Sequence, residues 1–256
     1  MTAIPIQILG ASFFATRHAS ADDALAGAPR EHTAPAFPLL VGRARRFTSL
    51  VTQLHMEVLG ALPRLGAEQR WPAVFATCHG EIHTAEVLIA DLAASGMVSS
   101  AQFAHSVHNT PSGLYSIATG NPAPTTTVTG ENAVAAGWLE AALVARESRQ
   151  PVVLSIADEP VPAVFGACDE AGGVAAAFLV AAGDGAGDAG DASDPGDAVA
   201  ARLVIGPAAA PPERTALLLA RAASAAARRA ADDIALGSLG AGSALRLQLD
   251  PARVSS

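Results

Sequence analysis

The sequence predicts an α/β fold in which a mainly parallel sheet is flanked by helices. Short, continuous apolar runs, such as residues 73–78 (AVFATC) and 151–157 (PVVLSIA), have the length of strands buried on both faces. Stretches with helical spacing of apolar residues lie between such runs, and this alternation is typical of layered α/β folds. Half of the 256 residues are hydrophobic and 16% are charged, which supports a large core and excludes a chain disordered throughout.

The N-terminal part supplies the first strands and helices. Residues 4–10 begin with alternating isoleucines and predict a strand. The proline-containing segment 17–38 predicts a loop. Helical periodicity predicts a helix over residues 39–62, and a second helix over 81–95, closed by Gly96.

The remaining elements follow from the same patterns. Residues 101–120 are broken up by proline and glycine and give no clear assignment. The predicted strands are 125–129, 151–157, 174–181, 201–206 and 244–249, and the predicted helices are 133–145 and a long helix that starts at Pro211 and ends before Gly237.

Residues 183–198 (GDGAGDAGDASDPGDA) hold five Asp and five Gly in 16 positions. Such a segment has too few apolar side chains to pack, so we expect a disordered loop. A calcium loop is the alternative, but the spacing matches neither the EF-hand nor the glycine-rich nonapeptide repeat.

The charge pattern argues against a nucleic-acid partner. The chain carries 16 basic and 24 acidic residues, a net charge of −8, and every basic residue is Arg. Sequence-independent binding to nucleic acid needs clustered positive charge, and no basic run occurs.

The cysteine count and the apolar runs predict a soluble, cytoplasmic protein with no membrane partner. Cys78 and Cys168 are too few for a disulfide framework, which suits a reducing compartment. No basic residue precedes Arg17, so no signal peptide is expected. The longest apolar run, residues 174–182, is far shorter than the ~18 residues that cross a bilayer.

The segment CHGEIH offers Cys78, His79 and His83 as metal ligands, because two His at i and i+4 share a helix face. Its His-x-Glu order is similar to that of zinc deaminases, but the Pro-Cys-x-x-Cys that they require is absent. We expect His79 in the turn after a strand, with the helix starting too late to hold both histidines. We therefore expect no metal. We favour the interpretation that these are polar residues at the carboxyl end of a strand, which is where open α/β sheets bind ligands.

A Ser–His nucleophilic pair is a further possibility in residues 103–113 (FAHSVHNTPSG). His105 and His108 lie near Ser106 and Ser112. The Gly-x-Ser-x-Gly elbow that presents a nucleophilic Ser is absent, so we favour histidines with a structural role.

Residues 125–143 (TTTVTGENAVAAGWLEAAL) place a β-branched strand directly before an Ala-rich helix. Several folds hold a nucleophile at such a corner, because the helix N-terminus supplies positive potential and free N–H groups. Here the corner residues are Glu131 and Asn132. We therefore expect the geometry of a nucleophile site but no nucleophilic side chain in it.

Residues 103–143 resemble the stretch around the active-site Cys of β-ketoacyl synthases, which have the thiolase fold. That family carries an Asn-x-x-x-Gly helix start, a Gly that ends the helix, and a Pro-Ser strand leading to the Cys. The matching positions are Asn109, Gly113, Gly120 and Pro124, with Asn132 at the Cys. ILGASFF resembles the family's first strand, and GGVAAAFLVA with AARLVIG resembles the pair that closes its N-terminal half.

The resemblance implies one thiolase-like domain over residues 1–256, similar to the N-terminal half of a ketosynthase. It is strongest to short, chain-length-factor-like subunits of aryl polyene and xanthomonadin-type pigment synthesis. Ketosynthases use a Cys and two His from a second half, which we expect to be missing because the chain ends near where that half begins. All seven histidines here lie between residues 18 and 108. Chain-length factors likewise replace the Cys, so Asn132 and Glu131 mark a pseudo-active position.

The resemblance also implies a partner and an interface. Ketosynthases pair edge to edge, and each subunit lines the acyl tunnel of the other. We therefore expect a heterodimer with a catalytic ketosynthase, transient contact with an acyl carrier protein, and no cofactor. The residues that the resemblance places at the tunnel or interface are Gly80, His83, Val87, Phe103 and Asn109.

Two alternatives remain open. One is an autonomous enzyme that uses Cys78, His79 and His83. The other is a scaffold that docks an acidic acyl carrier protein on its only basic cluster, Arg43, Arg45 and Arg46.

Overall fold

The computed structural model describes residues 2–42, 44–66, 68–166, 172–183, 198–207, 215–240 and 242–250. Within them the strands are β1 (Thr2–Ala15), β2 (Ala73–Thr77), β3 (Thr125–Thr129), β4 (Val152–Asp158), β5 (Val174–Ala182), β6 (Val199–Pro207), β7 (Asp232–Gly240) and β8 (Ser243–Leu249). The helices are α1 (Ala21–Leu25), α2 (Leu50–Gly60), α3 (Ile82–Ser95), α4 (Ser100–Phe103), α5 (Thr110–Thr119), α6 (Ala133–Ser148) and α7 (Thr215–Arg228), with 3-10 turns at Ala44–Phe47 and Ala163–Phe165.

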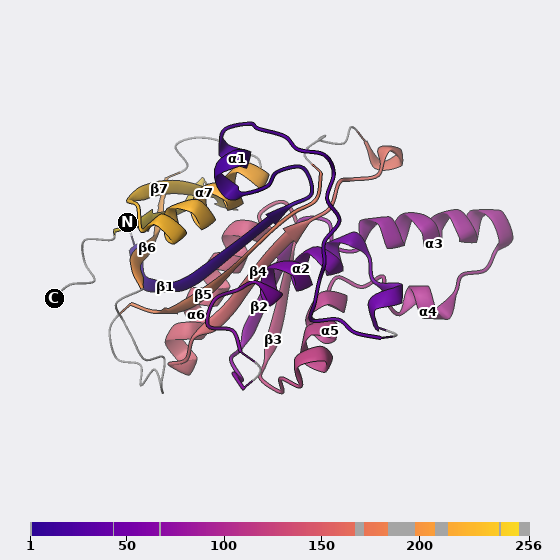
Figure 1. The fold of residues 1–256 in the computed structure, drawn as a ribbon, viewed down its shortest axis with the longest axis horizontal. Coiled ribbons are helices and arrows are strands. Elements are labelled where there is room, and N and C mark those ends of the chain that lie inside the picture. Colours follow the sequence, from indigo (N-terminus) through magenta and orange to yellow (C-terminus); the bar gives the residue numbers. More distant parts are fainter. Residues whose placement is uncertain are drawn as a thin grey trace.

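The strands form one sheet in the order β3-β2-β4-β5-β1-β6-β8-β7 (Figure 1). The expectation of a mainly parallel sheet is wrong. Strand β2 pairs in parallel with β3 and β4, whereas all the other neighbouring strands pair antiparallel. Parallel neighbours need a long crossover, and the connections from β2 to β3 and from β3 to β4 contain the helices that provide it.

The predicted strands are all present, but two helix predictions need correction. The helix expected over residues 39–62 begins only at Leu50, because the Ser49 side chain caps it by accepting from the Thr52 N–H. The last long helix ends at Arg228 instead of reaching Gly237, and the segment after it is β7. Its expected start at Pro211 lies outside the described residues, as do residues 184–197 of the expected Gly/Asp loop.

The predicted helix over residues 81–95 is confirmed as α3, and Gly96 closes it with a left-handed φ of 71°. The unassigned segment 101–120 contains α4 and α5. No helix in the described ranges has the length and hydropathy to span a membrane.

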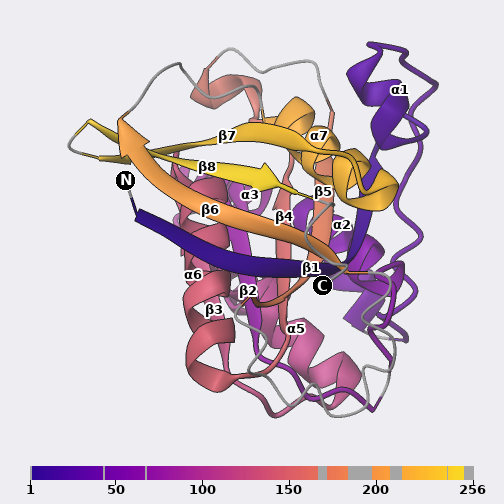
Figure 2. The ribbon, with the colours of Figure 1, turned by 90° about the vertical axis from the view of Figure 1, so that its left-hand side faces the viewer.

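Helix α6 lies at the centre of the larger of the two apolar cores. It packs against β2, β4 and β5, and also against β7 at the far end of the sheet. The sheet therefore curls around α6, and Figure 2 shows β6, β7 and β8 crossing in front of the plane of β4 and β5. On the opposite face, α2 and α5 cover β1 to β5 with the second core.

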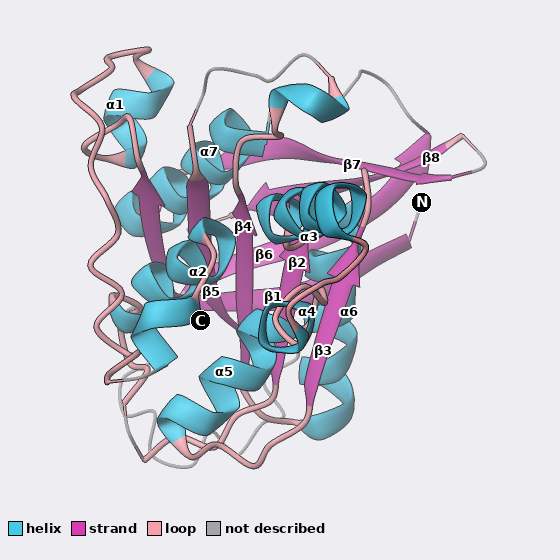
Figure 3. Cartoon of the chain, turned by 90° about the vertical axis from the view of Figure 1, so that its right-hand side faces the viewer, coloured by secondary structure: helices cyan, strands magenta, loops and turns pink. Residues whose placement is uncertain are grey.

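Helices α3 and α4 project away from the sheet as an arm, which we define as residues 82–103 (Figures 1 and 3). On α3 only Leu88 is buried. The large apolar side chains exposed on the arm are Val87, Ile89, Leu92, Met97, Val98 and Phe103. The arm is thus an apolar surface that the described chain leaves uncovered.

The close approach of α6 to the sheet predicts an unusual response to Gly137→Ala. A Cβ atom at residue 137 would lie 2.9 Å from the Cβ of Ala76 and 3.4 Å from Leu154 Cδ1. Glycine to alanine normally stabilises a helix by up to ~1 kcal/mol. Here we expect the free energy of unfolding to fall by about 1–3 kcal/mol because the core is overpacked.

The matched control is Gly113→Ala in α5, where a Cβ atom would meet nothing within 4 Å. Urea denaturation should show this variant unchanged or stabilised by ~0.5–1 kcal/mol. Equal midpoints for the two variants would contradict the tight contact between α6 and β2.

Candidate functional site

The carboxyl ends of the three parallel-paired strands meet at one edge of the sheet. Thr77 ends β2, Thr129 ends β3 and Asp158 ends β4, and the strand register brings these ends together. Open α/β sheets bind ligands at this edge, because helix N-termini and loops converge there. The sequence predicted this location from the polar residues that follow the strand over residues 73–78.

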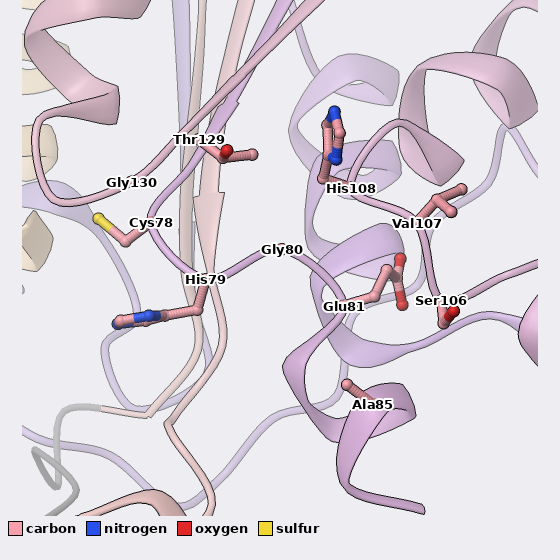
Figure 4. Close-up of a pocket in the computed structure, with 10 residues that line it drawn as sticks. All are labelled: Cys78, His79, Gly80, Glu81, Ala85, Ser106, Val107, His108, Thr129 and Gly130. Carbon is pink, nitrogen blue, oxygen red and sulfur yellow. The ribbon is translucent and has the colours of Figure 1, made fainter. Parts of the chain in front are cut away.

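A pocket of about 470 Å³ opens at this edge (Figure 4). It is lined by the end of β2, the start of α3, the loop between α4 and α5, and the turn after β3. Its residues are Cys78, His79, Gly80, Glu81, Ala85, Ser106, Val107, His108, Thr129 and Gly130. Figure 4 shows Cys78 and His79 on one side of Gly80, and Glu81, Ser106 and His108 on the other.

Cys78 is held in a state unsuited to nucleophilic attack. Its backbone N–H donates to Asp158 Oδ1 at 2.6 Å, and the Thr77 hydroxyl donates to the same oxygen at 3.0 Å. Burial, then the neighbouring Asp158 charge, raises the pKa of the thiol to about 12. Because the thiolate is the reactive form, Cys78 stays inert near neutral pH.

Asp158 is itself shielded from water. Burial raises the pKa of its carboxyl group, and its second oxygen, Oδ2, has no hydrogen-bond partner. When Asp158 is charged, its repulsion of a thiolate adds to the effect of burial on Cys78.

The structure does not assemble a metal site from Cys78, His79 and His83. His79 lies in the turn before α3, as expected, and α3 begins at Ile82. His83 Nε2 donates to the Pro160 carbonyl at 2.9 Å, and its Nδ1 lies 3.4 Å from Glu86. Over the described part of the chain, no three His, Cys, Asp or Glu side chains are grouped to bind a metal ion.

The two serines near the histidines are occupied by backbone contacts. Ser106 Oγ donates to the Phe103 carbonyl at 2.9 Å, and Ser112 Oγ donates to the Asn109 carbonyl at 2.9 Å. Neither hydroxyl is paired with His105 or His108, so no Ser–His nucleophile is formed.

Glu131 and Asn132 are exposed at the corner between β3 and α6. Gly130, with φ of 109°, makes the turn, and its N–H donates to the Cys78 carbonyl at 3.2 Å. Asn132 occupies the N-cap position, but its side chain makes no capping hydrogen bond. The free amide side chain therefore stands at the positive end of α6.

Strand β7 approaches this corner from the other end of the curled sheet. A Cβ atom at Gly237 would lie 3.8 Å from Asn132 Oδ1 and 3.5 Å from the Ala135 Cβ. Sequence reasoning missed this neighbour because it placed residue 237 beyond a helix. The only available signal was the alternation Ile234, Leu236 before the glycine.

The other predicted positions are dispersed around the pocket and the arm. A Cβ atom at Gly80 would lie 3.3 Å from His108 Cβ, so the residue lets the loop before α5 come close. Val87 and Phe103 are 44% and 60% exposed on the arm, and Asn109 starts α5. Of the basic cluster, Arg45 lies 4.1 Å over the Phe37 ring, while Arg43 and the Arg46 side chain lie outside the described residues.

Sequence reasoning also missed a pair of buried acids beside the pocket, Glu81 and Glu159. Their exposed fractions are 3% and 5%. Burial raises the pKa of Glu81, and burial with the neighbouring Glu81 charge raises that of Glu159 to about 7. The position of Glu159, two residues after the end of the strand predicted over residues 151–157, was the available signal.

The sequence matches the model of a known protein family. The sequence profile described as "Beta-ketoacyl synthase, N-terminal domain" matches residues 18–226. No curated protein sequence is significantly similar to the chain.

Two solved structures share the fold. One is a chain from the complex of the ketosynthase ApeO with its chain length factor ApeC from Xenorhabdus doucetiae. It has a TM-score of 0.70 and 17% identity, and the match covers 96% of this chain and 99% of that one. The other, the ishigamide ketosynthase/chain length factor, has a TM-score of 0.56 and 16% identity, covering 72% of this chain and 63% of that one. The expected thiolase-like α/β fold is confirmed.

The surroundings of Cys78 predict slow alkylation of its thiol. At pH 8 we expect iodoacetamide to modify Cys78 roughly a thousandfold more slowly in the folded chain than in urea, since the thiolate is scarce. Peptide mapping by mass spectrometry separates Cys78 from Cys168. Asp158→Asn should speed the reaction markedly and Glu131→Gln only slightly, following the order of their effects on the pKa. Equal rates in folded and unfolded protein would refute this account.

Proposed function

The chain belongs to the family of β-ketoacyl synthase N-terminal domains, and from this premise we propose that it is a noncatalytic, chain-length-factor-like subunit that pairs with a catalytic β-ketoacyl synthase. The observation that carries the proposal is Asn132. It stands at the corner between a strand and a buried helix, the position that the resemblance assigns to the nucleophilic Cys.

The chemistry of the corner supports the absence of a nucleophile. Claisen condensation needs a thiolate that becomes acylated, and an amide side chain cannot take that role. The nearest thiol, Cys78, is kept protonated, so it does not replace the missing group. On this proposal, the corner keeps the N-terminus of α6 and its N–H groups but lacks the nucleophilic sulfur atom.

The arm and strand β3 supply a surface suited to a partner. The apolar side chains of the arm are exposed, and obligate interfaces are built from such surfaces. In the described sheet β3 pairs only with β2, so its other edge presents free backbone groups. A ketosynthase pairing edge to edge would cover both features.

The pocket between Cys78 and His108 is proposed as part of an acyl tunnel shared with the partner. Gly80 lines it, His83 and Val87 lie on the adjoining helix, and Phe103 and Asn109 flank the loop that contributes Ser106, Val107 and His108 to its wall. On this proposal, side chains at these positions limit the length of the growing acyl chain.

The wider setting is proposed from the same resemblance. We propose polyene or fatty-acyl synthesis of the aryl polyene pigment type, in the cytoplasm. A carrier protein would deliver acyl groups transiently, and no cofactor would be bound by this subunit.

The proposed complex with a ketosynthase can be tested by isolating it. Pull-down of the tagged chain from its native cells, followed by native mass spectrometry, should yield a 1:1 complex with a ketosynthase that carries a Cys and two His. Val87→Trp in this chain should shorten the acyl products, whereas Asn132→Ala should leave turnover by the complex within about twofold. A stable monomer that recruits no ketosynthase would refute the proposal.

The apolar surface of the arm can be tested as the binding site for the partner by substitution. Leu92→Glu with Phe103→Glu should abolish co-purification of the ketosynthase, because two charges would be buried without partners. The matched control is Val41→Glu, which adds a charge at a side chain that is 75% exposed and outside the arm. Retention of the complex by the double variant would place the partner elsewhere.

A further inference from the structure

Glu81 and Glu159 occupy the base of the arm, where α3 leaves the sheet. Glu81 immediately precedes α3, and Glu159 immediately follows β4. Both residues are almost fully buried. Glu81 also lines the pocket, but the proposed function assigns no role to either carboxyl group. Buried acids are costly unless their oxygens are satisfied, so their contacts indicate what they hold in place.

Glu159 joins the first turns of two helices. Its Oε2 accepts from the Val51 N–H of α2 at 3.1 Å, and its Oε1 accepts from the His83 N–H of α3 at 3.3 Å. The first N–H groups of a helix have no partner within the helix. One side chain therefore serves both helices and fixes α3 against α2.

Glu81 repeats the same connection through hydroxyl groups. Thr52 of α2 donates to Glu81 Oε1 at 2.6 Å, and Thr84 of α3 donates to Oε2 at 3.1 Å. The other attachments described for α3 are the buried side chain of Leu88 and the hydrogen bond from His83 Nε2 to the Pro160 carbonyl. The two acids thus form the principal polar joint between the arm and the core.

We infer that the Glu81–Glu159 pair is a proton-sensitive joint that holds the arm firmly when it carries a proton and loosens it when both acids are charged. Two carboxylates buried together repel each other and have lost their hydration, so removal of the last proton weakens the joint.

The direction follows from the raised pKa values. Burial, with the Glu81 charge adding to it, raises the pKa of Glu159 to about 7, whereas an exposed Glu has a pKa of about 4.3. A group whose pKa is raised in the folded state stabilises that state fully below its unfolded pKa. That contribution is lost as the pH rises through the folded pKa, here between about 4.3 and 7.

Other titratable groups face the joint from each neighbouring element. They are His83 and Glu86 on α3, His105 after α4, Asp158 on β4 and His55 on α2. Positive charge on His83 or His105 would lower the pKa of the acids, but burial has the larger effect. Burial lowers the pKa of His55 to about 3, so His55 stays neutral throughout this range.

Hydrogen exchange of the full chain tests the joint. The α3 amides should be about tenfold less protected at pH 8 than at pH 6, after correction for the intrinsic exchange rate, because one proton with a pKa of about 7 is lost. Protection of the α6 amides reports the stability of the whole fold and serves as the reference for α3. The measurement needs no ketosynthase, so its result is independent of the proposed function.

Two variants and a control locate the effect. Glu81→Gln keeps a partner for each threonine hydroxyl but removes the charge that helps to raise the pKa of Glu159. The loss of α3 protection should therefore occur at lower pH in this variant. Glu159→Gln should remove the transition, and the exposed Glu147→Gln on α6 should behave as the parent chain. Constant protection in the parent chain, no shift in Glu81→Gln, or a transition retained in Glu159→Gln would each overturn the inference. If Glu159→Gln fails to fold, the shift in Glu81→Gln decides.

Discussion

The contact between α6 and the sheet is the constraint on which the rest of the structure depends. Gly137 and a series of alanines let the helix approach β2 and β4 closely, and Trp138 fills the space beside Phe178, with ring centroids 4.7 Å apart. Because β7 covers the same helix from the other side, α6 cannot shift without opening both halves of the curled sheet. Its N-terminus is therefore fixed beside the ends of β2 and β3, and this determines the geometry of the corner at Asn132.

That corner retains the architecture of a nucleophile site without its chemistry. Gly130 turns the chain, a helix N-terminus faces the pocket, and the adjacent backbone is tied to Cys78. Burial raises the pKa values of the neighbouring groups Cys78, Asp158 and Glu159. For Cys78 this shift disfavours the thiolate, which is the form that a nucleophile needs. This pattern agrees with a subunit that shapes a site for another protein.

The local part of the fold could be predicted from the sequence. Runs such as residues 151–157 identify buried strands, and Gly96 marks the end of α3. Both could be predicted because each signal is contained in a few neighbouring residues of the sequence. Strand direction and β7 could not be predicted, since they depend on pairing between distant segments. Asp232–Gly240 contains two glycines and a serine, and it forms a strand by pairing with β8. The edge of the sheet carrying the site was predictable from polar residues after strands. The buried acids were not, because their raised pKa values arise from packing against α2.

Glu81 connects the pocket with the arm, since it lines the pocket and also forms half of the joint beneath the arm. A movement of α3 relative to α2 must displace this side chain, and with it the pocket wall facing Ser106 and His108. The reverse also holds, because a group that fills the pocket and excludes water from Glu81 further disfavours its charged form. Occupancy of the pocket and retention of a proton at the joint then favour the same, firmly held position of the arm. Linkage makes such coupling reciprocal, so a partner that fixes the arm would also stabilise the shape of the pocket.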